Sequence, residues 1–229
     1  MKDVTLSRGL ADHVAVSSAP DFGRLAHIYR WMEWFSFGPF LSRCRCAFLP
    51  DLRDRKTALV LGDGDGRFTA RLMNENSHIH VDAVDASDAM LRELTRHAAS
   101  NVGRLQTFVA DARSFAPRFR SYDLIATHFF LDCLTTEEVE EVAARLRRQV
   151  ETSAEWVVSE FAVPGGRFGR FIARPVVAAL YLAFGWLTGL EIRRLPDHRS
   201  AMERAGWRLV SERKFLAGLL VSEFWRPAA

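Results

Sequence analysis

The sequence predicts an α/β fold in which helices cover both faces of a mostly parallel β-sheet. Short apolar runs typical of buried strands alternate with segments of helical periodicity between residues 57 and 163. Such alternation implies parallel pairing, because the helix after each strand carries the chain back to the edge of the sheet where that strand began. With 229 residues, 48% of them apolar, the chain is long enough for one domain with a full core.

Five apolar runs are expected to form strands. The first, TALVLG, has the continuous apolar character of a buried strand. The five runs cover residues 57–62, 79–85, 105–111, 122–129 and 155–163. Sheets of this class bind ligands at the carboxyl ends of their strands, so the residues that close these runs are candidate site residues.

Helices are expected between these strands. Phe68, Leu72 and Met73 share one face of the first helix, and Ser87 can cap the second. A third helix is predicted over residues 136–150. It carries two glutamates in its first turn and three arginines near its end, as the helix dipole favours.

The tail departs from the alternation. Gly206 closes a short helix, and the runs WRLVSERKF and GLLVSEFW follow as consecutive strands, which should pair antiparallel. We predict an N-terminal helical cap segment over residues 1–56, rich in Trp and Phe, and a ligand-binding domain over residues 57–229 that includes an aromatic insertion at about 164–195. The cap segment and the insertion are both expected to cover the ligand edge.

Charge and cysteine content narrow the functional class. The net charge is +3 and the positive charge is almost all Arg, which does not by itself indicate nucleic-acid binding. The three cysteines are Cys44, Cys46 and Cys133, and so few argue against a disulfide framework and favour a reducing, cytoplasmic location. We expect no signal peptide and no metal site. The uncharged run 175–190 is shorter than the roughly 20 residues that a spanning helix needs.

The stretch GDGDG at residues 62–66 lies between a predicted strand and a predicted helix. Its glycines permit sharp turning and close approach of the backbone to a ligand. The dinucleotide spacing G-x-G-x-x-G would require Gly where Arg67 stands, and no Gly-Lys-Ser/Thr follows for a P-loop. Asp63 and Asp65 would repel a pyrophosphate. They suit a ligand that has positive charge and no phosphate.

Two further acids close the next strands. Asp85 ends the second predicted strand and can accept from both ribose hydroxyls of a nucleoside. Asp111 ends the third and can accept from the amino group of a base. A nucleoside with a cationic appendage fits these positions, and S-adenosyl-L-methionine is such a molecule.

The motifs VLGDGDGRF, VDAVDASDAML, VADA and YDLIATHFFLD resemble, in order, those of class I S-adenosylmethionine-dependent methyltransferases. The resemblance covers about residues 57–163. It implies a Rossmann-like sheet of seven strands with an antiparallel last strand, and a product S-adenosyl-L-homocysteine. The resemblance and the positions together predict these cofactor contacts: Gly62, Asp63, Gly64, Gly66, Asp85, Ala86, Met90, Asp111, Ala112 and Thr127.

Residues 22–38 are similar to the N-terminal segment of the quinone-biosynthesis branch of these enzymes, in which a tyrosine reaches over the cofactor, and Tyr29 matches it. One departure concerns the acid that the family usually has two residues before its first loop glycine. Val60 stands there, and Asp63 is a plausible substitute for holding the methionine end.

The expected catalytic residues are His128, Asp132 and Tyr29. His128 follows the fourth strand and is either a general base, since its ordinary pKa is near neutral, or a structural histidine. Asp132 could orient His128, bind the acceptor or cap a turn. The aromatic insertion favours a small apolar or aromatic acceptor, and we expect it to form a lid.

Other functions stay open. The protein could bind the cofactor without transferring a methyl group, or could act at a membrane surface on a lipid-soluble acceptor, with residues 175–190 in the interface. The glycine spacing disfavours a nicotinamide oxidoreductase. The run THFF disfavours DNA amino-methylation, which usually shows Asn/Asp-Pro-Pro-aromatic at this point. We therefore expect no nucleic-acid partner.

Overall fold

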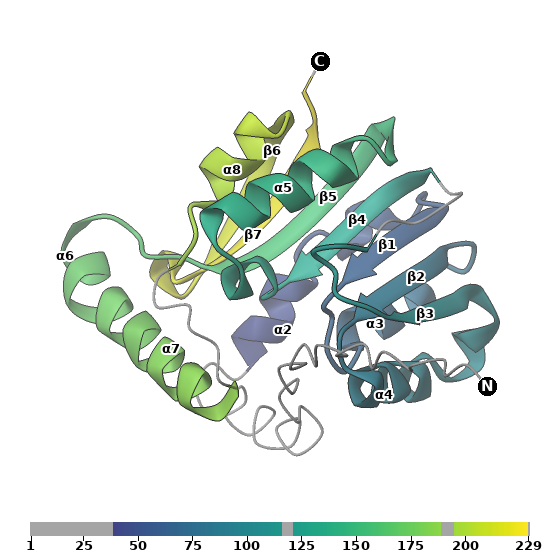
Figure 1. Cartoon of the computed structure of the whole chain (residues 1–229), viewed down its shortest axis with the longest axis horizontal. Coiled ribbons are helices and arrows are strands. Elements are labelled where there is room, and N and C mark those ends of the chain that lie inside the picture. The colour runs from purple at the N-terminus through teal and green to yellow at the C-terminus, as the bar shows by residue number, and fades with distance from the viewer. Residues whose placement is uncertain (1–38, 116–120, 189–194, 229) are drawn as a thin grey trace, which may run out of the picture.

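The computed structural model describes residues 39–115, 121–188 and 195–228, and within 181–188 the only side chain it describes is that of Leu182. Seven strands form one sheet in the order β3-β2-β1-β4-β5-β7-β6 (Figure 1). They are β1 (Thr57–Leu61), β2 (His80–Asp85), β3 (Leu105–Val109), β4 (Tyr122–His128), β5 (Val150–Phe161), β6 (Trp207–Phe215) and β7 (Leu220–Pro227). β1 to β5 pair in parallel, and β7 is antiparallel to both of its neighbours. The predicted fold class and the antiparallel tail are confirmed.

Helical segments connect and flank these strands. The α-helices are α2 (Pro39–Arg45), α3 (Arg67–Glu75), α4 (Asp88–Ala98), α5 (Thr136–Arg147), α6 (Gly166–Phe168), α7 (Arg174–Thr188) and α8 (His198–Arg204). The shorter turns are η1 (Leu49–Leu52), η2 (Ala99–Arg104), η3 (Leu131–Cys133), η4 (Gly169–Ala173) and η5 (Leu216–Gly218). As predicted, Ser87 caps α4 and accepts from the backbone N–H of Met90. Thr135 and Glu138 form a capping box at α5, which the sequence analysis did not foresee.

The apolar side chains divide between the two faces of the sheet. On one face, α5 and α8 pack against strand residues that include Trp156, Trp207 and Trp225. On the other face, α3 and η1 pack against strand residues that include Val60 and Phe224. The acid expected at position 60 in the resemblance would stand in this second core, where Val60 is buried.

Several predicted boundaries were wrong by a few residues. β3 ends at Val109, so Asp111 lies two residues beyond the strand and starts a turn. The predicted third helix ends at Arg147, and β5 begins at Val150 instead of residue 155. The start of β5 is polar and exposed, so it lacks the apolar pattern that marks a strand, and the pairing of Tyr122 with Val150 defines it instead.

The aromatic insertion forms α6, η4 and α7, which stand out from the sheet on the side of β5 and β7 (Figure 1). Its inner side chains Ala173 and Val177 belong to an apolar cluster with Leu41 of α2, with Phe129 after β4 and with Leu220 of β7. The insertion therefore contacts the chain next to the carboxyl end of β4. Phe40 of α2 packs against the same cluster, whereas Tyr29 and the rest of the cap segment up to residue 38 lie outside the described residues.

Candidate functional site

The loop between β1 and α3 contains three glycines with left-handed backbone angles. The φ angles of Gly62, Gly64 and Gly66 are 65°, 59° and 78°. A Cβ at Gly62 would lie 2.5 Å from Cδ2 of Phe130, and a Cβ at Gly66 would lie 2.3 Å from Cγ of Leu94, so both positions require glycine. A Cβ at Gly64 would meet nothing within 4 Å. The loop is thus tightly packed at both ends and open in the middle, as close approach of a ligand requires.

Asp63 is buried inside this loop. Its Oδ2 accepts hydrogen bonds from the backbone N–H and the hydroxyl of Thr69, at 2.9 Å and 2.7 Å, and so ties the loop to the first turn of α3. Its Oδ1 is also buried and has no hydrogen-bond partner among the described residues. Burial raises the pKa of Asp63 to about 6, although the bonds from Thr69 and the charge of Arg45 oppose the rise. A buried carboxyl oxygen without a partner suits a cationic group of a ligand.

Asp85 lies at the end of β2, beside the open middle of the glycine loop. Its carboxylate accepts from the backbone N–H of Ser87 at 2.8 Å and from the backbone N–H of Gly64. Burial raises the pKa of Asp85, and these two hydrogen bonds oppose the rise. The structure therefore brings Asp85 and the glycine loop together, as the strand order predicts.

Asp111 lies further out and is exposed. Arg113 holds its carboxylate with contacts of 2.7 to 3.1 Å, and this pairing lowers the pKa of Asp111. The same guanidinium reaches Glu138 at 3.0 Å. A nucleobase whose amino group contacts Asp111 would have to share the carboxylate with Arg113. Recognition of the nucleobase by Asp111 therefore stays a prediction, and this geometry does not favour it.

The remaining predicted cofactor contacts differ in their surroundings. Ala86 is exposed and Met90 is half-buried, so both have surface that a ligand could meet. Ala112 is buried in the core that includes α5. Thr127 is fully buried, and its hydroxyl accepts from Nε1 of Trp156 at 2.9 Å. A cofactor contact by Thr127 stays a prediction, because its hydroxyl is already engaged inside the core.

His128 follows Thr127 in β4, so its side chain points to the opposite face of the sheet. It is 3% exposed, and its ring centroid lies 4.2 Å from that of Phe68. Its Nδ1 is 3.0 Å from Oγ of Ser159, whose hydroxyl donates to the carbonyl of Cys44. Nδ1 is therefore engaged inside the core, whichever of the two atoms donates the proton.

Nε2 of His128 is buried without a hydrogen-bond partner among the described residues. Burial, followed by the positive charge of Arg45, lowers the pKa of His128 well below its ordinary value. The ring is therefore neutral, which is the state that a base needs, but it is enclosed. The described contacts of the ring do not include Asp132, so the structure does not support the hypothesis that Asp132 orients it.

A pair of carboxyl groups lies near the carboxyl ends of β4 and β5. Asp132 is half-buried in η3, and Sγ of Cys133 donates to its Oδ1 at 3.5 Å. Glu160 is 1% exposed, and its Oε1 accepts from the backbone N–H groups of Phe130 and Leu131, at 3.2 Å and 2.8 Å. Its Oε2 is buried and unpaired within the described part of the chain. Burial, and next the negative charge of Asp132, raise the pKa of Glu160 well above its ordinary value.

Two charged residues close to this site, Glu160 and Arg45, were not predicted from the sequence. Glu160 holds the loop that packs on Gly62, and it sits in a strand whose pattern indicates only burial. Arg45 ends α2, lies 5.2 Å from the ring centroid of Phe129, and its charge acts on both Asp63 and His128. No local pattern around Arg45 marks it, because its importance comes from a contact between distant parts of the chain.

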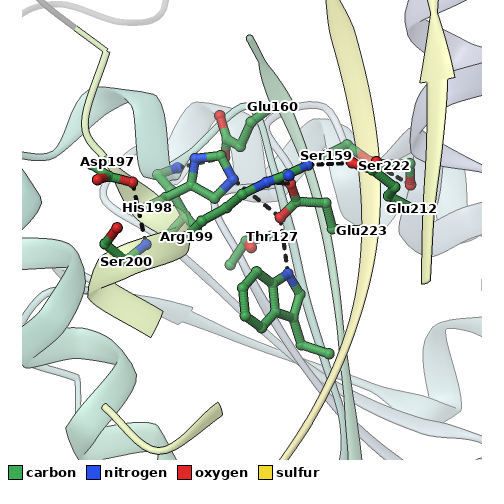
Figure 2. A network of polar contacts seen from close by, with 12 residues as sticks. Thr127, Ser159, Glu160, Asp197, His198, Arg199, Ser200, Glu212, Ser222 and Glu223 are labelled. Atoms are coloured by element: carbon green, nitrogen blue, oxygen red, sulfur yellow. Dashed lines mark hydrogen bonds and ion pairs between the residues drawn. The ribbon is translucent and has the colours of Figure 1, made fainter. Parts of the chain in front are cut away.

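Figure 2 shows a polar network further along the sheet, between α8 and β7. Glu223 is fully buried. It accepts from Nε2 of His198 at 3.1 Å, from Nε of Arg199 at 2.6 Å and from Nε1 of Trp225 at 2.9 Å. Burial alone would raise the pKa of Glu223, but His198 and Arg199 lower it overall. The network anchors α8 to the sheet, and we assign it a structural role.

The fold is that of the Rossmann-like methyltransferases. Residues 58–153 match a family model described as a methyltransferase domain. No curated protein sequence matches the chain. Among the described residues, no helix is both long enough and apolar enough to cross a membrane.

Solved structures share the fold at low sequence identity. The mitomycin 7-O-methyltransferase MmcR is 15% identical, with a TM-score of 0.66 over 94% of this chain and 62% of that one. An O-methyltransferase family protein from Burkholderia thailandensis is 16% identical, with a TM-score of 0.63 over 90% of this chain and 62% of that one. The N-methyltransferase NodS from Bradyrhizobium japonicum WM9 is 12% identical, with a TM-score of 0.56 over 82% of this chain and 97% of that one. The chain thus spans 62% of the length of each of the first two proteins.

Proposed function

We propose that this protein is an S-adenosyl-L-methionine-dependent methyltransferase that acts on a small molecule. The observation that carries the proposal is the loop of three glycines, open at Gly64, with a buried unpaired oxygen of Asp63 on one side and Asp85 on the other. The match of residues 58–153 to a methyltransferase domain supports it. The names of the structural neighbours include both O- and N-methyltransferases, so they favour no particular acceptor atom.

The residues fit the cofactor in three respects. The unpaired Oδ1 of Asp63 is suited to bind the α-ammonium group of the cofactor. In this role Asp63 takes the place of the acid that the family usually has at the position of Val60. Asp85 is suited to the ribose hydroxyls, since its carboxylate is fixed by two backbone N–H groups and remains partly exposed. The backbone at Gly64 leaves room for close approach. When bound, the cofactor supplies a methyl group that is already activated by a sulfonium sulfur.

The chain then has to align the acceptor, exclude water and accept any proton that the acceptor releases. Asp132 is half-buried near the carboxyl end of β4, whereas His128 is enclosed between Phe68 and Ser159. Burial raises the pKa of Asp132, which brings the carboxylate closer to the proton affinity that a base requires. We therefore place the proton acceptor at Asp132 ahead of His128. Tyr29 keeps its predicted role over the cofactor.

We also propose that the insertion closes an apolar acceptor site. Its inner face shares an apolar cluster with Phe129, immediately after β4. Replacing Phe184 by Ser should impair methyl transfer and leave cofactor affinity nearly unchanged, because the glycine loop and Asp85 lie elsewhere. Leu182→Ser is the matched control, since that side chain is 75% exposed. Equal losses of activity in the two variants, or a loss of cofactor affinity in Phe184→Ser, would contradict the lid.

The decisive experiment compares ligands by calorimetry. We expect the protein to bind S-adenosyl-L-homocysteine and not NAD⁺, because the glycine spacing lacks the dinucleotide pattern. Incubation with a methyl-labelled donor and a small-molecule extract of the source cells should then yield a labelled product. Binding without any labelled product would favour the alternative of a cofactor-binding protein, and binding of NAD⁺ instead would overturn the proposal.

A further inference from the structure

One side of the insertion, which we call the outer face, combines exposed apolar side chains with arginines. Its members are Phe168, Phe171, Ile172 and Leu182, together with Arg167, Arg170 and Arg174. Phe171 is 66% exposed, and Phe168, Phe171 and Ile172 follow the i, i+3, i+4 spacing of one helix face. Aromatic and aliphatic side chains gathered at a surface in this way mark an interaction site.

The insertion is held in a fixed orientation, so the outer face is a defined surface. Ala173 and Val177 are buried against the rest of the fold, and a Cβ at Gly169 would lie 1.5 Å from the carbonyl oxygen of Pro164. The wider π-helical turn of η4 ends two residues before Pro175 and contains Phe171, whose carbonyl the proline ring would meet in a regular α-helix. One side of the segment is therefore packed inward while the apolar side chains and the arginines face outward.

Charge indicates the kind of partner. The arginines at 167, 170 and 174 repeat along one side, and residues 161–188 contain no Asp or Glu. All three are exposed, and none forms an ion pair within the described part of the chain. Large apolar side chains next to arginines on a helical segment are the features of an interfacial segment. Anionic headgroups complement the arginines, and the acyl region complements the apolar side chains.

We propose that the outer face docks the protein on a membrane surface that contains anionic lipids, with Phe168, Phe171 and Ile172 inserted at the headgroup boundary. The attraction of each arginine to such a surface corresponds to about 1 kcal/mol. The docking surface lies apart from the glycine loop and Asp85, so the proposal does not depend on methyl transfer.

Co-sedimentation with vesicles tests the proposal. We expect the full chain to bind vesicles that contain phosphatidylserine in phosphatidylcholine, and to bind vesicles of phosphatidylcholine alone far more weakly. Raising the salt concentration should release it, because screening weakens the attraction of exposed charges. Arg167→Gln with Arg170→Gln should weaken binding roughly 30-fold, which corresponds to about 1 kcal/mol for each arginine. Phe171→Ser should weaken it roughly tenfold through lost apolar burial.

The control makes one change of each kind, an apolar residue to Ser and an arginine to Gln, on another surface. Val109 is 59% exposed and Arg148 is exposed, so Val109→Ser with Arg148→Gln alters hydropathy and charge without touching the outer face. This control should bind vesicles like the unaltered protein. Failure to bind anionic vesicles at low salt, or equal losses in the control, would overturn the proposal. Sedimentation velocity adds a second check, because a dimer that Phe171→Ser dissociates would mean that the outer face pairs with a second copy instead.

Discussion

In its proposed role, we expect Asp63 to make the binding of the cofactor dependent on pH in a way that can be calculated. With a pKa of about 6, its carboxyl is about one-tenth ionised at pH 5 and about nine-tenths ionised at pH 7. A ligand ammonium that binds the ionised form should therefore bind roughly tenfold more weakly at pH 5, a difference of about 1.4 kcal/mol. The α-ammonium stays largely charged over this range, because ordinary α-amino groups titrate near pH 8.

Calorimetry with two ligands isolates this effect. S-adenosyl-L-homocysteine carries the amino-acid end, whereas methylthioadenosine lacks it and keeps the same nucleoside. We expect the affinity of the first to rise about tenfold from pH 5 to pH 7 and that of the second to stay flat. Asp63→Asn should weaken binding of S-adenosyl-L-homocysteine roughly 10- to 100-fold at pH 7 and remove its pH dependence, because it removes a charge-assisted hydrogen bond.

The stability of the ligand-free protein gives a second readout. A carboxyl whose folded pKa is raised contributes stability below its unfolded pKa, and this contribution is lost as pH rises through the folded pKa. For Asp63 the loss falls between about pH 4 and pH 6 and amounts to at most about 3 kcal/mol. Chemical denaturation should show this loss in the wild-type protein and not in Asp63→Asn. Equal pH dependence for both ligands, or equal weakening of both by Asp63→Asn, would mean that Asp63 only shapes the loop.

Three further changes have defined outcomes. Asp85→Asn should weaken both ligands alike, roughly 10- to 100-fold by calorimetry, since both contain the ribose; an effect on one ligand alone would contradict the assignment. Gly66→Ala should destabilise the fold by about 3 kcal/mol in chemical denaturation, because of its φ of 78° and the contact that a Cβ would make with Leu94. Gly64→Ala should destabilise it by only about 1 kcal/mol, because a Cβ there meets nothing within 4 Å. Similar losses of stability in the two variants would show that the loop is not open at its middle. Glu223→Gln should cost about 3 kcal/mol at pH 7, because it breaks a buried charge network. The pKa of Glu223 is lowered, so this contribution should fade as pH falls below the ordinary glutamate pKa of about 4.3; a loss independent of pH would contradict that reasoning.

Local patterns along the chain were enough to predict the fold class and the place of the glycine loop. Continuous apolar runs such as that of β1 define buried strands locally, and the two tail strands were predicted by their own composition. The glycines at 62, 64 and 66 and the acid at the end of β2 have fixed places relative to strand ends, so their proximity follows from parallel pairing. These features depend on short stretches of chain, which is why a sequence can predict them.

Which polar atoms of the described residues are engaged in hydrogen bonds depends on contacts between distant parts of the chain. The sequence offers Asp63 in the glycine loop and Asp111 after a strand as ligand contacts alike, but Thr69 and burial leave one oxygen of Asp63 unpaired, while Arg113 holds Asp111. The pairing of Glu160 with the loop after β4, and the nearness of Arg45 to Asp63, join segments that are far apart in the chain. The desolvation and charge that shift a pKa depend on three-dimensional packing, and no local pattern records them.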